Sequence, residues 1–427
     1  MTRLICLIHP IRPIRLIAPM PLTLIQLISE QTVPNLLPIL RLRPDRVVHL
    51  TTPKTSARAS HLRAAAHAAG LKPEVEVIEL SPMPGVSETH HAVRESLLQA
   101  REAGGDAAVN FTGGTKLMSI GAFSAALREK APSLYVDTQD FCFVDGDTSP
   151  RMAELLENDW SFTPIRKQLR VDILAIANGV PRVTTGKPWQ PLLPLAEHLS
   201  LHPADEQATH AALHGTAGLF PNAKEPRQPA DWLPVLDRPI ALPHAVARLA
   251  IETGLVRPGP AANTVMLPDP TRAELDHLAH HQVPDFAARY FQAVAPLQHA
   301  AAFLTGGWWE VIVCHAAHQS GAFSDLRWSA HVGERGGPDT EEDILGLHGV
   351  ELLYINCKRG GAKARLLPLL EEIRARAATI GGAFNRRYLA LQQPPTGAVA
   401  RNLHQRAAAL GIRLLYPKNL NTPNPFA

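Results

Sequence analysis

Short apolar runs alternate with longer segments in which apolar residues recur at helical spacing. The runs predict buried strands at residues 22–28, 46–50, 75–80 and 106–111, and the longer segments predict helices at 55–70, 88–103 and 117–128. A further pair of strands is predicted at 134–136 and 141–144. Repeated strand–helix units favour a mostly parallel sheet with right-handed crossovers. The pattern therefore predicts an α/β domain over residues 21–160.

Polar loops follow three of these strands, at the edge where open α/β sheets bind their ligands. In the third loop, the sequence Thr-Gly-Gly-Thr-Lys joins a strand to a helix, an arrangement that presents backbone N–H groups and a positive dipole end to an anion. Its glycines permit close backbone approach and its lysine adds charge. The spacing matches neither a nucleotide-hydrolysing P-loop nor a dinucleotide fingerprint, and an ordinary glycine-rich turn is the alternative. The candidate ligand-binding residues are Ser29, Gln31, Thr32, Thr51, Thr52, Thr112, Gly113, Gly114, Thr115 and Lys116.

The rest of the chain separates into a proline-interrupted segment, 161–282, and a C-terminal region, 283–427. The first predicts a small helical or winged-helix-like connector. In the second, a Gly-Gly-Trp-Trp turn leads into a helix that carries Glu310, and polar loops follow it. Asp343 then leads into a strand, and the next strand, 350–358, precedes a helix at 362–378. Strand alternation places Asn356 and Lys358 on one face of that second strand.

This order of residues is compatible with a metal-dependent nuclease. Hard divalent ions prefer oxygen ligands, which Glu310, Asp343 and Asn356 can supply. Such an ion polarises a phosphate and activates water, while a lysine such as Lys358 stabilises the developing charge. The alternative is that Asp343 and Lys358 are ordinary surface residues and that Glu310 only favours the start of its helix.

Composition narrows the setting. The chain has 427 residues and a formal net charge of +3, too mild to indicate nucleic-acid binding except through a local basic surface. Its four cysteines form no close pair, which favours a reducing cytoplasm, and no apolar stretch is long enough to span a bilayer. Residues 1–20 resemble neither a signal peptide nor a stable strand. We expect them to be an upstream extension, with Met20 as the natural start.

The loops at 27–35 and 111–118 resemble the two ligand-contacting loops of CARF domains, the Rossmann-like sensors of CRISPR systems. The resemblance covers roughly residues 21–145. It implies a homodimer that binds cyclic oligoadenylate, with cyclic tetra-adenylate as the best family expectation. In this arrangement the backbone N–H groups and Lys116 would bind phosphates, and the hydroxyls of Ser29 and Thr112 would bind ribose or base.

The C-terminal region resembles the PD-(D/E)xK, or restriction-endonuclease-like, fold of the CRISPR ancillary nucleases that carry a CARF domain. The resemblance makes Glu310 the first-helix acid, Asp343 the central metal ligand and Lys358 the catalytic lysine. Asn356 departs from the pattern because it stands where an acid is usual. An amide oxygen ligates metal without negative charge, which favours Mn²⁺ over Mg²⁺. Otherwise Glu342 or Glu351 supplies the missing carboxylate, or catalysis is lost.

Together the two resemblances imply a cyclic-oligoadenylate-activated, metal-dependent nuclease of type III CRISPR defence. Single-stranded RNA or DNA is the expected substrate, and nicking of duplex DNA is a variant of the same activity. The alternative is a messenger-binding module, or a messenger-gated nucleic-acid binder, whose nuclease-like domain is weakened or inactive because of Asn356.

Overall fold

The computed structural model describes residues 20–146, 150–221, 224, 226–269, 271–333, 339–360, 363–420, 422 and 425–426. The expected upstream extension, apart from Met20, lies outside these residues. Two compact units make up the chain. The first comprises Met1–Glu30 and Pro34–Ser161, and the second comprises Gln31–Val33 and Phe162–Ala427. Each unit is described by itself.

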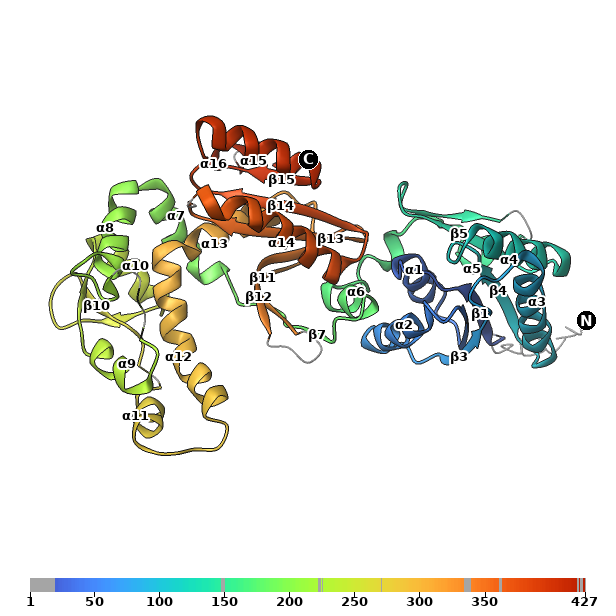
Figure 1. The fold of residues 1–427 in the computed structure, drawn as a ribbon, viewed down its shortest axis with the longest axis horizontal. Coiled ribbons are helices and arrows are strands. Elements are labelled where there is room, and N and C mark those ends of the chain that lie inside the picture. The colour runs from blue at the N-terminus through green and yellow to red at the C-terminus, as the bar shows by residue number, and fades with distance from the viewer. Residues whose placement is uncertain are drawn as a thin grey trace, which may run out of the picture. The chain divides into compact units, whose positions relative to one another are not determined.

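The first unit is built on a six-stranded sheet of order β3-β2-β1-β4-β5-β6, in which the last strand alone runs antiparallel to its neighbour (Figure 1). Its strands are β1 (Leu22–Leu27), β2 (Arg46–Thr51), β3 (Glu74–Glu79), β4 (Asp106–Asn110), β5 (Ser133–Asp137) and β6 (Cys142–Asp145). The strand order reverses between β1 and β4, so the loops that follow these two strands flank the switch point at which such sheets bind ligands.

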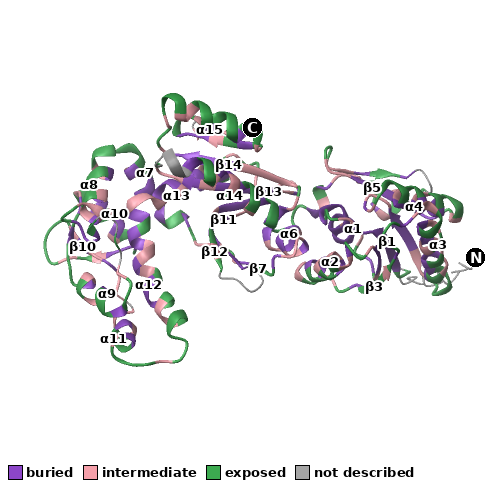
Figure 2. Cartoon of the chain, in the orientation of Figure 1, coloured by how far each residue is buried: buried purple, intermediate pink, exposed green. Residues whose placement is uncertain are grey.

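Helices complete the alternation that the hydrophobic pattern predicts. They are α1 (Val33–Leu42), α2 (Ser56–Ala68), α3 (Val86–Glu102), α4 (Lys116–Glu129) and α5 (Arg151–Leu155). Small residues of α4, including Ala122, Ala125 and Ala126, pack with Ile25 and Val109 of the central strands in one buried cluster. The buried strands and the exposed outer helix faces are visible in Figure 2.

The second unit contains a six-stranded mixed sheet of order β15-β14-β13-β12-β11-β7. Its strands are β7 (Arg182–Val183), β11 (Ser324–Gly333), β12 (Thr340–His348), β13 (Glu351–Lys358), β14 (Asn385–Leu391) and β15 (Ile412–Leu415). β13, β14 and β15 are parallel, so their carboxyl ends share one edge of the sheet. β12 pairs antiparallel with β11 and with β13.

Helices α13 (Trp308–Gln319) and α14 (Lys363–Gly381) pack on this sheet, and α15 (Gly397–Ala409) and α16 (Pro417–Leu420) lie near its β15 edge. Ile355 and Cys357 of β13 join the core that contains α13. Leu352 on the opposite face lies against Gly381, at the end of α14. The unit also contains helix α6 (Val171–Ala177).

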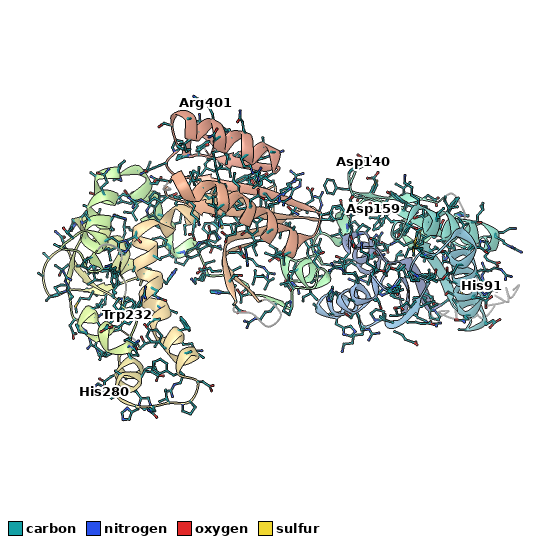
Figure 3. The ribbon with its side chains drawn as sticks, in the orientation of Figure 1. His91, Asp140, Asp159, Trp232, His280 and Arg401 are labelled. Atoms are coloured by element: carbon teal, nitrogen blue, oxygen red, sulfur yellow. The ribbon has the colours of Figure 1, made fainter. Side chains whose placement is uncertain are left out.

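The segment predicted as a connector is helical with a small antiparallel sheet of order β8-β10-β9. Its elements are α7 (Leu193–Leu201), α8 (Pro203–His214), α9 (Pro229–Leu236), β8 (Ile240–Ala241), α10 (His244–Glu252), β9 (Arg257–Pro258), β10 (Thr264–Met266) and α11 (Arg272–His280), and α12 (Phe286–Ala302) follows the segment. Trp232, labelled in Figure 3, is fully buried there and donates to the Tyr290 hydroxyl at 3.1 Å. The segment and the mixed sheet share one hydrophobic core, which runs from Trp189 to Phe426.

One expectation about local structure is wrong. The stretch between the Glu310 helix and Asp343 is not all polar loop, because Ser324–Gly333 forms β11. Trp328, Ala330 and Val332 supply its buried positions. Among the described residues, no helix is both long and apolar enough to cross a membrane.

Candidate functional site

In the first unit, the loops after β1 and β4 lie against one another. A methyl group at Gly113 would sit 2.0 Å from the Leu27 carbonyl oxygen and 3.5 Å from the Ser29 nitrogen. Only glycine therefore permits this approach. Gly114 adopts a φ of +75°, the left-handed conformation in which glycine is favoured. The local structure therefore explains why the predicted motif has glycine at both positions.

Helix α4 begins at Lys116, directly after these glycines. Thr115 is its N-cap, and the Thr115 side-chain oxygen accepts from the Met118 N–H at 3.3 Å. The other first-turn N–H groups have no partners within the helix, which makes this end a favourable place for an anion. Lys116 is exposed, and no carboxylate of the described residues lies within ion-pair distance of it. The geometry suits a phosphate-bearing ligand.

The hydroxyls predicted to bind ligand differ in how far they are already used. Thr112 donates to the Asn110 side-chain oxygen at 2.7 Å and accepts from the Val136 N–H at 2.7 Å, so it braces the loop against β5. Thr32 is buried, and its hydroxyl donates to the Asn178 side-chain oxygen at 2.8 Å. Both residues belong to the second unit, which includes the Gln31–Val33 stretch.

Four other predicted ligand-binding residues differ in their burial and hydrogen bonding. Thr51 is fully buried, and its hydroxyl has no hydrogen-bond partner among the described residues. The Thr52 N–H donates to the Thr55 hydroxyl at 3.0 Å, which closes a local turn. Ser29 is half-buried and Gln31 is exposed. Of these four, Ser29 lies nearest the glycine loop in the contacts described above.

A buried polar network that the sequence did not single out supports these loops. Asn110 donates to the Pro34 carbonyl at 3.0 Å, and its amide also lies 3.4 Å from the Gln26 side-chain oxygen. The Gln26 amide in turn lies 3.1 Å from a ring nitrogen of His49. Burial, together with the Arg63 charge, lowers the pKa of His49 to about 3, so the ring is neutral. The network contains no net charge at physiological pH.

In the second unit, two half-buried carboxylates and a lysine come together. Glu310 lies in the first turn of α13, and its carboxylate accepts from the Trp328 indole N–H at 2.9 Å. Burial and the nearby Asp343 carboxylate raise the pKa of Glu310 to about 8, although Trp328 and Lys358 act against the rise. Desolvation and the Asp343 charge both disfavour the ionised form of Glu310, and a bound cation would offset both effects.

Asp343 lies where two strands separate. The pairing of β12 with β13 extends to Ile344 and Ile355, and just beyond it the Asp343 carboxylate accepts from the Cys357 N–H at 2.6 Å. The Lys358 ammonium lies 3.5 Å from the same oxygen. Burial raises the pKa of Asp343, against the effects of Lys358 and the Cys357 N–H. Burial also opposes the Lys358 charge, but the Asp343 and Glu310 carboxylates hold the pKa of Lys358 above its ordinary value.

The donor set for a metal is two carboxylates and one amide. The Asn356 side-chain oxygen is buried and has no hydrogen-bond partner among the described residues. Strand alternation places Asn356 on the same face of β13 as Lys358. Across the described part of the chain, no three His, Cys, Asp or Glu side chains are grouped to hold a metal ion. An orphaned amide oxygen on the face of Lys358 nevertheless fits a hard cation, since such ions take oxygen ligands of either kind.

The two carboxylates expected to compensate for Asn356 are both engaged elsewhere. Glu342 accepts from the Tyr354 hydroxyl at 2.5 Å and pairs with Arg376, and Glu351 accepts from Arg386 at 2.6 Å.

Glu341 is the further acid near the pair, since its charge makes a small contribution to raising the pKa of both Glu310 and Asp343. It is held by the Ser329 hydroxyl and by Lys187 at 3.2 Å. Trp328, Ser329 and Lys187 were missed because the strand β11 was missed and because Lys187 is distant in sequence.

Fold and site together define a class of protein: a Rossmann-like domain followed by an α/β unit with a half-buried acidic centre. Residues 23–144 match the family model of the Card1 CARF domain. Two solved structures resemble nearly the whole chain. Can2 from Sulfobacillus thermosulfidooxidans, solved in complex with cyclic tetra-adenylate, has a TM-score of 0.60 and 17% identity over 94% of each chain.

The second structure is VC1899 from Vibrio cholerae, with a TM-score of 0.64 and 16% identity over 93% of this chain and 95% of that one. No curated protein matches the sequence. At these identities the two structures show a shared fold. With the family match, they confirm the predicted likeness to CARF-domain CRISPR ancillary proteins and the predicted α/β fold class.

Proposed function

We propose that this protein is a cyclic-oligoadenylate-activated, metal-dependent nuclease of type III CRISPR defence that cleaves single-stranded RNA or DNA. The observation that carries the proposal is the half-buried pair of Glu310 and Asp343 beside Lys358, in a chain whose other unit matches a CARF domain. Like charges removed from water are costly unless a cation joins them, and a divalent ion would do so.

Glu310, Asp343 and Asn356 would hold a divalent ion, Mg²⁺ or Mn²⁺. When bound, such an ion polarises the scissile phosphate and lowers the pKa of an attacking water. Lys358 places its ammonium beside Asp343, where it neutralises charge that develops on the phosphate. The Trp328 indole holds the Glu310 carboxylate in one orientation. With an amide in place of the usual acid, the site has less negative charge and favours Mn²⁺, which binds more tightly than Mg²⁺ at most sites.

The messenger would bind at the switch point of the first sheet. The N–H groups at the start of α4 and the Lys116 ammonium offer positive ends to phosphates, while the network beneath them carries no opposing charge. Cyclic tetra-adenylate is the candidate, and the Can2 structure in complex with that ligand supports it. Coupling to cleavage requires that the messenger bind the competent state more tightly.

The exposed face of α4 supports the proposal of a homodimer. Leu117, Ile120 and Leu127 are each more than half exposed, at 52%, 55% and 54%. At 100° per residue they lie on one side of the helix, opposite its buried alanines. Such an apolar stripe marks a contact surface, and a two-fold dimer would present two copies of the loops to a ring-shaped ligand. Ile120→Glu should convert dimer to monomer in light scattering, whereas Ser60→Glu, at an exposed position of α2, should not.

The nuclease proposal is tested by cleavage of labelled single-stranded RNA and DNA with Mn²⁺ and cyclic tetra-adenylate. Asp343→Asn should reduce cleavage by more than roughly a hundredfold because it removes a metal ligand. Asp276→Asn, on the exposed helix α11, is the matched control and should cleave as wild type. Equal cleavage by wild type and Asp343→Asn would exclude this centre as the active site.

The second candidate function is messenger binding without cleavage, and Asn356 is the observation that favours it. If the centre is a weakened nuclease, Asn356→Glu should raise cleavage by restoring a charged ligand beside Lys358. If that variant still binds Mn²⁺ but cleaves nothing, the domain acts as a messenger sink or a messenger-gated nucleic-acid binder.

A further inference from the structure

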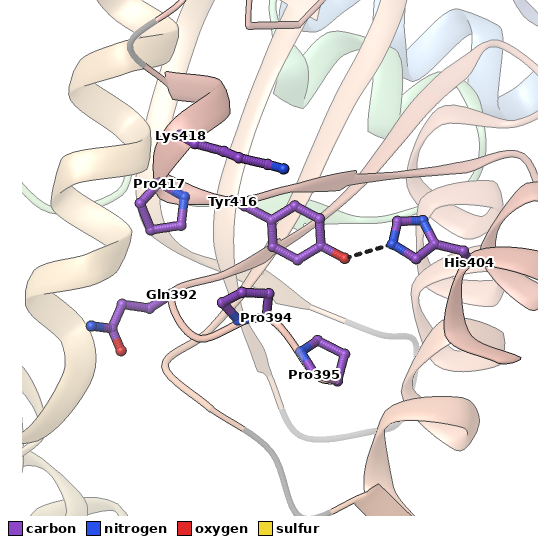
Figure 4. A pocket seen from close by; sticks show the side chains of 7 residues that line it. All are labelled: Gln392, Pro394, Pro395, His404, Tyr416, Pro417 and Lys418. Carbon is purple, nitrogen blue, oxygen red and sulfur yellow. Dashed lines mark hydrogen bonds between the residues drawn. The ribbon is translucent and has the colours of Figure 1, made fainter. Parts of the chain in front are cut away.

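A hollow lies at the carboxyl ends of β14 and β15, outside the acidic centre. It has a volume of about 390 Å³, within the range of roughly 300–1,000 Å³ typical of small-ligand sites. Its walls include three proline rings, the Tyr416 ring, the Gln392 amide and the Lys418 side chain. In Figure 4 the Tyr416 ring lies in the middle of this group, with Lys418 on one side and Pro394 and Pro395 on the other.

The hollow lies next to the end of the strand that carries Lys358. Lys358 ends β13 and pairs with Leu391 at the end of β14. The next residue, Gln392, donates its backbone N–H to the Lys358 carbonyl at 3.0 Å. The wall of the hollow therefore begins one strand away from Lys358, on the edge where β13, β14 and β15 all end. A polymer bound at the acidic centre would pass this edge.

Its polar groups are those that recognise a nucleotide. Tyr416 is 8% exposed, and its hydroxyl lies 3.2 Å from a ring nitrogen of His404, which fixes the ring (Figure 4). The proline rings and the exposed part of the Tyr416 ring can accept the flat face of a base.

This hollow differs from three others in the second unit in how its basic side chain is paired. Their basic residues are paired with acids: Lys187 with Glu341, Arg248 with Glu252, and Arg406 with Glu371. By contrast, Lys418 is exposed and has no carboxylate within ion-pair distance in the described part of the chain. No acid lines its hollow. An uncompensated cation beside a base-sized cavity suits a phosphate.

We propose that this hollow binds one nucleotide of the nucleic-acid strand beside the scissile phosphate. The base lies against Tyr416 and the prolines, and Lys418 contacts a backbone phosphate. The inference rests on the proposed function, because it takes the substrate of the Lys358 centre to be a single-stranded nucleic acid. It adds a site that determines how the strand is positioned.

The test is binding of a fluorescein-labelled single-stranded 12-mer RNA to the full chain in EDTA, with saturating cyclic tetra-adenylate. Lys418→Ala should weaken binding by about five- to tenfold. Loss of one phosphate contact should also reduce the slope of log affinity against log salt by about 0.7, a change that a structural role would not produce. Lys167→Ala removes an exposed lysine elsewhere in the second unit and should change neither quantity. Tyr416→Phe keeps the ring and should bind within about twofold of wild type.

The outcomes separate this inference from the nuclease proposal. Wild-type affinity and salt slope in Lys418→Ala would overturn the nucleotide site, even if wild type cleaves. Lys418-dependent binding in a protein that never cleaves would support the nucleotide site while the nuclease proposal fails. Absence of any 12-mer binding by wild type would contradict the nucleotide site. If Lys418→Ala is poorly folded, Lys418→Gln provides the second variant, with several-fold weaker binding expected.

Discussion

The two units bury polar groups in opposite ways. Beneath the loops of the first, Gln26, His49 and Asn110 form a neutral network in which the His49 ring is held uncharged. The centre of the second contains Glu310 and Asp343, two acids whose pKa values are raised by burial, and the Asp343 charge adds to the rise at Glu310. A site for a polyanion must not oppose it with negative charge, whereas a site for a cation must supply that charge. The difference supports the proposal that the first unit binds phosphates and the second binds a metal ion.

The largest expected effect is on cleavage, which we assign to the second unit alone. Lys358→Ala should reduce cleavage by roughly 10²–10³-fold, because it removes the cation that neutralises charge on the phosphate. Messenger affinity should stay unchanged, since it belongs to the other unit. Cleavage rates and calorimetric titration of cyclic tetra-adenylate measure the two effects on one preparation. Lys167→Ala is the control. A loss of messenger affinity as large as the loss of cleavage would break the comparison.

Metal should stabilise the second unit alone. With Mn²⁺ at a hundred times its Kd, ligand linkage predicts a gain of about 2.7 kcal/mol in free energy of unfolding. Hydrogen exchange should therefore slow in β12 and β13 peptides on addition of Mn²⁺ and stay unchanged in β1 and β4. The double variant Glu310→Gln with Asp343→Asn should show no Mn²⁺ effect. Equal protection of both units by Mn²⁺ would contradict a site at these acids.

Lys116→Ala should weaken cyclic tetra-adenylate binding by about thirtyfold, the effect of losing a charge-assisted contact of roughly 2 kcal/mol. Cleavage should recover when the messenger concentration is raised to saturation, because the acidic centre is intact. Lys130→Ala, at the other end of α4, should bind as wild type. Normal messenger affinity in Lys116→Ala would remove this lysine from the ligand site.

The smallest expected effect is the loss of stability of the first unit at low pH. The pKa of His49 is lowered to about 3 by burial, from an ordinary value of 6.5. The unfolded chain therefore binds the proton first, and stability is lost as pH falls below 6.5. At pH 5.5 the loss is about 1.4 kcal/mol. Hydrogen exchange of a β2 peptide, corrected for its intrinsic rate, measures it against pH 7.5. Unchanged β2 protection at pH 5.5 would show that His49 is not held neutral.

Much of the first unit was accessible from sequence because its signals are local. Apolar runs predicted β1, β2, β3 and β4 to within about a residue at most ends, and the glycine motif lies at the predicted strand–helix junction. The network beneath it was not predictable, since Gln26, His49 and Asn110 come from three strands and meet only in the folded sheet.

The second unit was less accessible because its centre is assembled from distant segments. Glu310, Asp343 and Lys358 were singled out, and the structure brings them together. Trp328 was missed although Leu326, Trp328, Ala330 and Val332 alternate with polar residues, a pattern typical of a strand. Lys187 and Glu341 meet only through tertiary folding. The choice of Glu342 or Glu351 as a compensating acid had no basis that sequence spacing could test.

The central claim is that a messenger bound by the first unit controls metal-dependent cleavage by the second. The most direct measurement is cleavage of labelled single-stranded RNA and DNA by the full chain, with Mn²⁺ and cyclic tetra-adenylate each omitted in turn. We predict cleavage only when both are present. Equal cleavage with Mn²⁺ alone, or tight messenger binding without cleavage under any of these conditions, would contradict the account.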